Sequence, residues 1–415
     1  MPAELPSVGP KRPAVKRHLI TALKLTLIAL AGAAGLLTAL WLEHRSEIAL
    51  PPLTGHFAVG RMTYAWVNDA QTDELAEAPG VKRQVLVWIW YPAARSQSVV
   101  PADYLPAPWR AALERASGVL MSQFLTRDLA MVRVHSFAAP DISEELPAYP
   151  VVIMRAGGGA LTTDFTTLAE DLASHGYVVA GFDAPYRTGV VVFPDGRVVL
   201  RPPAADPENL PAAGQSRLID KLLPMWSGDA QFVVDQLERL NAADSPGRFA
   251  GRLDLLRLGI FGHSFGGATA LQFCHDDSRC KAGIDIDGAP YGSAVKDGVT
   301  QPFLFLLSDH GDLSAPEART VFGDIGSIYD RLPNGRLLLI IRGANHFSFS
   351  DQILLKSHYI VRLMQLFLGG LDGRRGLTIT TAWVHTFFDV YLKDAPASTL
   401  DKLRLDYPEV QSIRR

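Results

Sequence analysis

Apolar and polar positions along the chain first separate an N-terminal segment from everything that follows. Residues 25–42 read LTLIALAGAAGLLTALWL and contain no charged side chain. A helix of that length spans about 27 Å, close to the thickness of the hydrocarbon core of a bilayer. The pattern therefore predicts one transmembrane helix at 25–42, after a basic leader at 1–24 and before a linker at 43–55.

The charges that flank this segment indicate its orientation. Lysines and arginines precede it, whereas Glu43 and Glu47 follow it. The positive-inside rule then places the leader in the cytoplasm and the rest of the chain on the extracytoplasmic side, periplasmic or extracellular. A cleaved signal peptide, which would make the protein secreted, and a buried core helix are the alternatives. We favour the anchor because the leader is long and no small-residue cleavage site follows Leu42, although Ala29-Leu30-Ala31 lies inside the run.

From residue 56 onward, short apolar runs alternate with stretches of helical periodicity. The expected strands are 59–67, 83–91, 150–154, 177–182, 256–261, 282–286, 302–307 and 336–341. The expected helices are 108–130, 161–175, 229–241, 267–274, 352–368 and 378–392. Strands that alternate with helices predict an α/β domain at 56–393, with a mostly parallel sheet covered on both faces and antiparallel N-terminal strands. Residues 394–415 remain as a C-terminal tail.

One interval, 187–226, does not follow this alternation. It is rich in proline around Pro202-Pro203 and between Pro207 and Pro211. Long irregular segments inside a compact domain often act as lids over a site. We therefore interpret 187–226 as a partial cap, with a surface excursion that has no role as the alternative.

The segment 259–268 carries the main chemical signal of the chain. It reads GIFGHSFGGA and holds a G-x-S-x-G pentad between β-forming residues and small, helix-compatible residues. This context is typical of a nucleophile elbow, where a serine on a sharp strand-to-helix turn exposes its hydroxyl above the sheet. We therefore predict that Ser264 is a catalytic nucleophile.

A serine nucleophile needs a base, and position separates the histidines of the chain. His346 follows the last strong strand, where the order Ser…Asp…His of α/β-hydrolases places the base. His263 is expected to point away from the serine. His175, at a predicted helix end, is expected to cap that helix. His358 and His385, on predicted C-terminal helices, are expected to pack or to face solvent.

Four carboxylates compete for the role of the residue that orients this base. Asp285 and Asp287 end the strand that follows the serine helix, and Asp309 and Asp312 follow the next strand. A carboxylate at a strand end can equally be a solvated turn residue or a helix cap. Position alone leaves these four candidates open.

An acyl-transfer site also needs fixed donors for the negative charge on the attacked carbonyl oxygen. The backbone N–H of Phe265, directly after the serine, is one predicted donor. The second is expected from the loop 155–160, RAGGGA, after the first buried strand, with Gly158 best placed. The loss of one such donor typically costs about 3–4 kcal/mol of transition-state stabilisation.

Composition excludes several other functions. The net charge of −3 and the scattered basic residues argue against a nucleic-acid partner. No dinucleotide-binding or P-loop motif and no cysteine–histidine spacing of a zinc site occurs, so we expect no cofactor and no metal. Cys274 and Cys280 can form a disulfide in an oxidising compartment, or remain two buried thiols.

Several segments together resemble the α/β-hydrolase family that includes the plasma and intracellular type II platelet-activating factor acetylhydrolases and their bacterial relatives. The resemblance runs from about Gly55 to Leu368. Besides the glycine loop and the strand 283–287, it rests on VWIWYP (87–92), LASHGYVVA (172–180), GHSFGGAT (262–269) and RGANH (342–346). This resemblance implies an α/β-hydrolase fold, metal-independent hydrolysis of short or oxidised acyl groups of phospholipids, and Asp287 as the acid.

One departure from the family concerns the oxyanion loop. Family members often have histidine or proline before the loop glycine, whereas this chain has Ala156, and Gly158 replaces a larger residue. We expect this loop to be looser than in the family, which affects the prediction of substrate preference more than the prediction of reaction type. The leading hypothesis is thus a serine carboxylic ester hydrolase acting on short-acyl small-molecule or lipid esters. The alternatives are a dienelactone- or polyester-type esterase on non-lipid esters and a catalytically silent, membrane-tethered binding protein.

Overall fold

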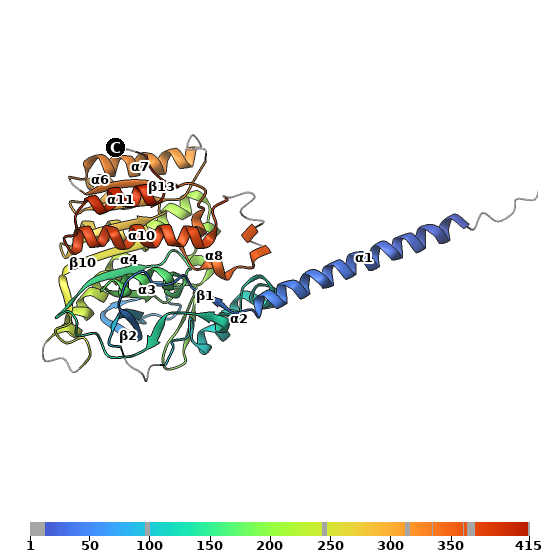
Figure 1. Cartoon of the computed structure of the whole chain (residues 1–415), viewed down its shortest axis with the longest axis horizontal. Coiled ribbons are helices and arrows are strands. Elements are labelled where there is room, and N and C mark those ends of the chain that lie inside the picture. The colour runs from blue at the N-terminus through green and yellow to red at the C-terminus, as the bar shows by residue number, and fades with distance from the viewer. Residues whose placement is uncertain are drawn as a thin grey trace, which may run out of the picture.

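The structure is a computed structural model that describes residues 13–95, 100–242, 247–311, 316–333, 335–359, 361–362 and 370–413. One long helix, α1 (Pro13–His44), extends away from an α/β domain that contains the other elements (Figure 1). Short elements connect the main ones: β1 (Ile48–Ala49), η2 (Leu129–Met131), β4 (Val132–Arg133), η3 (Thr162–Phe165), α6 (Ser293–Asp297) and η6 (His346–Phe349).

A ten-stranded sheet forms the centre of the domain. Its strands are β2 (Ala58–Thr72), β3 (Lys82–Ala93), β5 (Ser136–Ala138), β6 (Tyr149–Arg155), β7 (Val178–Asp183), β10 (Leu253–His263), β11 (Cys280–Ile286), β12 (Phe303–Leu307), β13 (Arg336–Ile341) and β14 (Val410–Ser412). They lie in the order β14-β13-β12-β11-β10-β6-β7-β3-β2-β5. The six strands from β13 to β7 run parallel, and β3 pairs antiparallel with both β7 and β2. This sheet confirms the predicted fold class.

Helices cover both faces of the sheet because its central strands carry apolar side chains on both sides. In β6, Val152 and Met154 join the cluster that contains α3 (Thr166–Ser174) and α10 (Gly373–Leu392). Val151 and Ile153, on the opposite face, join the cluster of α4 (Ala212–Asn241), α5 (Phe265–Asp276) and α7 (Pro316–Arg331). Each such fully buried side chain contributes about 1.5–3 kcal/mol to folding.

Several predicted elements differ from those observed. The helix expected at 108–130 is α2 (Ala107–Leu120), kinked at Gly118 with its positive φ of 76°, followed by a π-helical turn, η1 (Met121–Leu125). The helix expected at 352–368 begins as the short α8 (Gln352–Leu355), and residues 360 and 363–369 lie outside the described residues.

The interval 187–226 contains regular elements that were not predicted from the sequence because of its high proline content. A two-stranded hairpin, β8 (Val190–Val192) and β9 (Val198–Leu200), is followed by the 3-10 turns η4 (Pro203–Ala205) and η5 (Pro207–Asn209). Helix α4 then begins at Ala212, well before the predicted residue 229, and continues through Pro224. After α10, helix α11 (Ser398–Asp406) leads to β14, which pairs antiparallel with β13.

Among the described residues, one helix is long and apolar enough to cross a membrane. The segment His18–His44 of α1 meets both criteria, and 6% of its apolar window is buried inside the protein. The C-terminal end of α1 is fixed to the domain through Glu43, which pairs with Arg127 at 3.2 Å and accepts a hydrogen bond of 2.6 Å from Ser357 Oγ. The apolar helix is therefore anchored to the domain at its last turn (Figure 1).

The two cysteines form a disulfide. Cys274 near the end of α5 is bonded to Cys280 at the start of β11. Of the two alternatives that the sequence left open, the structure thus has the closed loop rather than two buried thiols.

Candidate active site

Ser264 lies on a sharp turn between β10 and α5. Its backbone has φ 56° and ψ −126°, a conformation that costs a residue with a side chain about 1–3 kcal/mol. The serine N–H donates to the carbonyl oxygen of Ile286 at 2.9 Å, which ties the turn to the end of β11. Strained backbone held by its surroundings is characteristic of functional sites.

The two glycines of the pentad allow this turn because other backbone atoms pass directly beside them. A Cβ on Gly262 would lie 1.9 Å from the carbonyl oxygen of Gly266. A Cβ on Gly266 would lie 2.1 Å from the carbonyl oxygen of Arg155. No side chain fits at either position without moving the backbone, so the pentad spacing follows from close packing of β10, α5 and β6.

Asp287, directly after β11, is held by three hydrogen bonds. Its Oδ2 lies 2.7 Å from Nδ1 of His346, and its Oδ1 accepts from the N–H of Ser308 at 2.8 Å and lies 3.2 Å from Nε2 of His310. Burial alone would raise the pKa of this carboxyl, but the hydrogen bonds from His310 and His346 outweigh it and hold the pKa well below its usual range. The carboxylate therefore faces both imidazoles as an anion.

The other three candidate carboxylates have different surroundings. Asp285 is fully buried, accepts a hydrogen bond from the N–H of Gly288 at 2.8 Å, and burial raises its pKa well above the ordinary value. Asp309 pairs with Arg342 at 2.9 Å and accepts from the N–H of Gly343. Asp312 lies outside the described residues. Of the described candidates, Asp287 is the carboxylate that contacts His346.

His346 begins the turn η6 after β13. His263, the residue before Ser264, contacts His346. Nε2 of His263 lies 2.9 Å from the backbone carbonyl oxygen of His346, and the two ring centroids are 4.4 Å apart. Burial, followed by the neighbouring His346, lowers the pKa of His263 to about 3, so a neutral ring donates this hydrogen bond. The sequence had assigned no part in the site to His263.

Ser264 Oγ and His346 form no hydrogen bond in the described structure. Bonds between a nucleophile and its base are often long or poorly aligned before substrate binds. The serine turn and the His346 turn are nevertheless linked, because His263 precedes Ser264 directly and contacts His346.

The glycine loop after β6 lies against the serine. A Cβ on Gly157 would lie 2.9 Å from Cβ of Ser264, so this glycine allows the close approach. The N–H of Gly158 donates no hydrogen bond to any described residue. Phe265 is the first residue of α5, whose N–H has no acceptor within its own helix. The N–H groups of Gly158 and Phe265, both predicted as oxyanion donors, thus have no backbone acceptor among the described residues.

A cavity of about 320 Å³ contains Ser264. Its lining includes Gly158 and Phe265, together with residues from the interval 187–226: Arg187, Arg201, Ala205, Asp206, Pro207, Gln215, Ile219, Leu222 and Trp226. Ala289 and Tyr291 complete the lining. A larger cavity of about 380 Å³ lies at the base of α1 and contains none of the predicted catalytic residues.

His310, which the sequence did not single out, gives a test of the electrostatics around Asp287. Its hydrogen bond to Asp287 raises the pKa of His310 above the ordinary value of about 6.5. The stabilisation from this bond is fully present below about pH 6.5 and is lost as the pH rises through the higher pKa of the folded state. We expect His310→Ala to lower the thermal midpoint more at about pH 6 than at about pH 9. Equal losses at the two pH values would show that the charged hydrogen bond does not stabilise the fold.

Comparison with known proteins places these features in a family. The family described as "Platelet-activating factor acetylhydrolase, isoform II" matches residues 42–187 and 224–396. A protein of Arthroderma benhamiae named "Probable 1-alkyl-2-acetylglycerophosphocholine esterase" is 27% identical, with 63% of this chain and 65% of that protein covered. The platelet-activating factor acetylhydrolase of Bos taurus is also 27% identical, with 59% of this chain and 57% of the relative covered.

A solved structure resembles the domain as well. A ferulic acid esterase from Streptomyces cinnamoneus superposes with a TM-score of 0.72 at 27% identity, over 89% of this chain and 100% of that structure. This chain spans somewhat under two thirds of the length of the curated relatives that it matches. The family match, however, covers most of the α/β domain on both sides of the interval 187–226, and the chain belongs to the family of platelet-activating factor acetylhydrolase, isoform II.

Proposed function

We propose that this protein is a serine carboxylic ester hydrolase in which Ser264, His346 and Asp287 form the catalytic triad. The observation that carries the proposal is the 2.7 Å contact between Asp287 Oδ2 and His346 Nδ1, next to a serine in a strained elbow. Membership of an acetylhydrolase family and similarity to a ferulic acid esterase support the same class of reaction.

In the proposed mechanism, Ser264 Oγ attacks the acyl carbon of the ester while Nε2 of His346 takes the hydroxyl proton. Asp287 accepts the hydrogen bond from Nδ1 of His346, which fixes the tautomer and stabilises the imidazolium that forms. His346 then returns the proton to the leaving alcohol oxygen. Water, deprotonated by His346, attacks the acyl-enzyme and releases the acid and Ser264.

The oxyanion of each tetrahedral intermediate would accept hydrogen bonds from the N–H groups of Gly158 and Phe265. Both residues line the cavity that contains Ser264. Loss of one such donor typically raises the barrier by about 3–4 kcal/mol, so the backbone course of the glycine loop matters as much as the triad itself.

For the substrate we propose esters with a short acyl group, including phospholipid esters. The cavity around Ser264 has a volume of about 320 Å³, and much of its wall comes from the interval 187–226, which would act as a partial cap. One relative is named an acetylglycerophosphocholine esterase and another an acetylhydrolase, and both names support a short acyl group. Aromatic esters are the second candidate, because Trp226, Phe265 and Tyr291 line the cavity.

For localisation we propose a single-pass membrane protein anchored by α1, with the α/β domain on the extracytoplasmic side. The basic residues before the apolar segment support this orientation. The disulfide between Cys274 and Cys280 supports an oxidising compartment. Removal of the N-terminal segment by a signal peptidase would instead release a secreted enzyme.

Hydrolysis of p-nitrophenyl esters by the full chain in detergent tests the proposed activity and acyl preference. We expect kcat/KM to be highest for acetate and butyrate esters and to fall steeply for octanoate and longer acyl groups, because the capped cavity limits chain length. A feruloyl ester measured beside them distinguishes the aromatic candidate. No turnover of any ester would contradict the proposed function, and a preference for long acyl groups would contradict the proposed substrate.

A further inference from the structure

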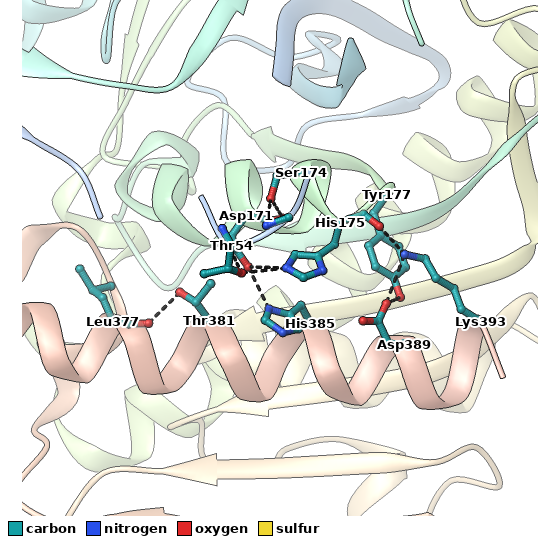
Figure 2. Close-up of polar contacts among 11 residues, drawn as sticks. Thr54, Asp171, Ser174, His175, Tyr177, Leu377, Thr381, His385, Asp389 and Lys393 are labelled. Atoms are coloured by element: carbon teal, nitrogen blue, oxygen red, sulfur yellow. Dashed lines mark hydrogen bonds and ion pairs between the residues drawn. The ribbon is translucent and has the colours of Figure 1, made fainter. Parts of the chain in front are cut away.

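A second cluster of chemically active side chains lies away from the cavity around Ser264, where α3 packs against α10. Asp171 and His175 lie four residues apart on and just after α3, and His385 lies on α10 (Figure 2). One ligand atom from each of the three residues lies within 4.8 Å of the other two. Two imidazoles and a carboxylate in such proximity are a common ligand set for transition-metal cations.

The distances within the cluster are close to those of a tetrahedral site. Oδ2 of Asp171 lies 2.9 Å from Nδ1 of His385 and 3.8 Å from Nε2 of His175. Ligand bonds of about 2.0–2.1 Å to a tetrahedral zinc ion place neighbouring ligand atoms about 3.3 Å apart. The observed distances lie on either side of this value, so the ligand atoms are near enough to share one cation once the imidazole rings reorient.

Thr54 holds one oxygen of the Asp171 carboxylate, Oδ1, and the other oxygen, Oδ2, faces the two histidines. Oδ1 of Asp171 accepts hydrogen bonds of 2.8 Å from both the N–H and the hydroxyl of Thr54. Thr54 Oγ1 also lies 2.8 Å from Nε2 of His175 (Figure 2). The bonds to Oδ1 orient the carboxylate, as partners of metal ligands commonly do, whereas ligation through Nε2 of His175 would replace the contact with Thr54 Oγ1.

The site is accessible although its carboxylate is buried. The side chain of Asp171 is 2% exposed, whereas those of His175 and His385 are 21% and 15% exposed. Nearby, the ammonium of Lys393 is directed to Asp389 and to the carbonyl oxygen of His175 (Figure 2). A cation can therefore reach the cluster from solvent past the two imidazole edges.

We propose that Asp171, His175 and His385 form a binding site for a divalent transition-metal cation of the zinc class. The two imidazole rings now stack with centroids 4.0 Å apart and planes inclined by 22°. Because a metal lies in the plane of each ring that binds it, the rings turn apart when the cation enters. The bound cation would join three parts of the chain: the linker at Thr54, helix α3 and helix α10. This proposed metal site does not depend on the proposed esterase activity.

The test uses Zn²⁺ itself as the probe. The full chain in detergent, stripped with a chelator, is titrated with Zn²⁺ against a chromogenic competitor, and bound zinc is counted by elemental analysis. We expect one Zn²⁺ per chain at micromolar free zinc and a rise in thermal midpoint of about 3 °C at saturation. No saturable binding would show that the cluster is a hydrogen-bond network only and would overturn the proposal.

Two variants and two controls assign the binding to these residues. His385→Gln keeps a donor toward Asp171 but removes a metal ligand, and Thr54→Val removes the hydroxyl bond to Asp171 while keeping the backbone N–H bond. We expect each to weaken Zn²⁺ binding by about tenfold or more and to remove the thermal shift. His56→Gln changes a histidine whose side chain is 67% exposed, outside the cluster, and should leave binding unchanged. Binding that is unaffected by His385→Gln but lost with His310→Gln would place the zinc at Asp287 and overturn the proposal.

Discussion

Replacement of Ser264 by alanine is expected to lower kcat for p-nitrophenyl acetate by about 10⁶-fold. Removal of the nucleophile in other serine hydrolases with a triad has an effect of this size, and the remaining rate comes from substrate binding and the oxyanion donors. KM should change little because the hydroxyl contributes to the transition state more than to ground-state binding.

The fold should tolerate this substitution. Alanine at φ 56° is no more strained than serine, and the hydrogen bond from the N–H of residue 264 to Ile286 belongs to the backbone. We therefore expect the thermal midpoint of Ser264→Ala to match that of the wild type within about 1–2 °C. A variant that folds and retains more than about a hundredth of the wild-type kcat would exclude Ser264 as the nucleophile.

Replacement of Asp287 by asparagine is expected to lower kcat by about 10⁴-fold. The carboxylate accepts the Nδ1–H of His346 at 2.7 Å, and an amide at this position no longer fixes the tautomer whose Nε2 can accept the serine proton. Asparagine is among the residues that tolerate positive φ best, and Asp287 has φ 53°, so the backbone should remain in place.

Asp309→Asn is the matched control for this substitution. Asp309 contacts Arg342 and Gly343 before the His346 turn and forms no hydrogen bond with the imidazole of His346 in the described structure, so its amide variant should change kcat by less than about tenfold. The opposite ranking, with Asp309→Asn inactive and Asp287→Asn active, would contradict the proposed triad. For Asp287→Asn, kcat is measured at two pH values. A loss at both values indicates that His346 no longer acts as the base, whereas recovery at the higher pH indicates a shift in the pH dependence.

The arrangement of the sheet could be predicted because the apolar runs in this chain are short and alternate regularly with helical segments. The edges of the sheet could not. β14 has a single buried residue, Val410, and joins the sheet only because the partner strand β13 leaves its edge open to it. The predicted start of helix α4 was too late because the prolines up to Pro211 suggested irregular chain, whereas the helix begins at Ala212 and continues through Pro224.

The sequence predicts those residues of the candidate site whose place in the chain order is distinctive. It does not predict the residues that are identified only by their contacts. Ser264 follows from its pentad, and His346 from its place after the last strand. The four candidate carboxylates could not be separated by position, because their distances to the imidazole depend on how β11 and β12 end. His263 and His310 are recognised only through their contacts with His346 and Asp287. The cluster of Asp171, His175 and His385 is likewise invisible to spacing rules, since packing of α3 on α10 assembles it.

The measurement that tests the central claim most directly is identification of the residue that a fluorophosphonate labels in the folded full chain. Such a probe forms a covalent bond with an activated serine by displacement of fluoride. We expect mass spectrometry of the digested protein to find one adduct, on Ser264, and none in Ser264→Ala. An adduct on another residue, or folded wild-type protein that resists the probe, would contradict the proposed triad and favour a silent binding protein with this fold.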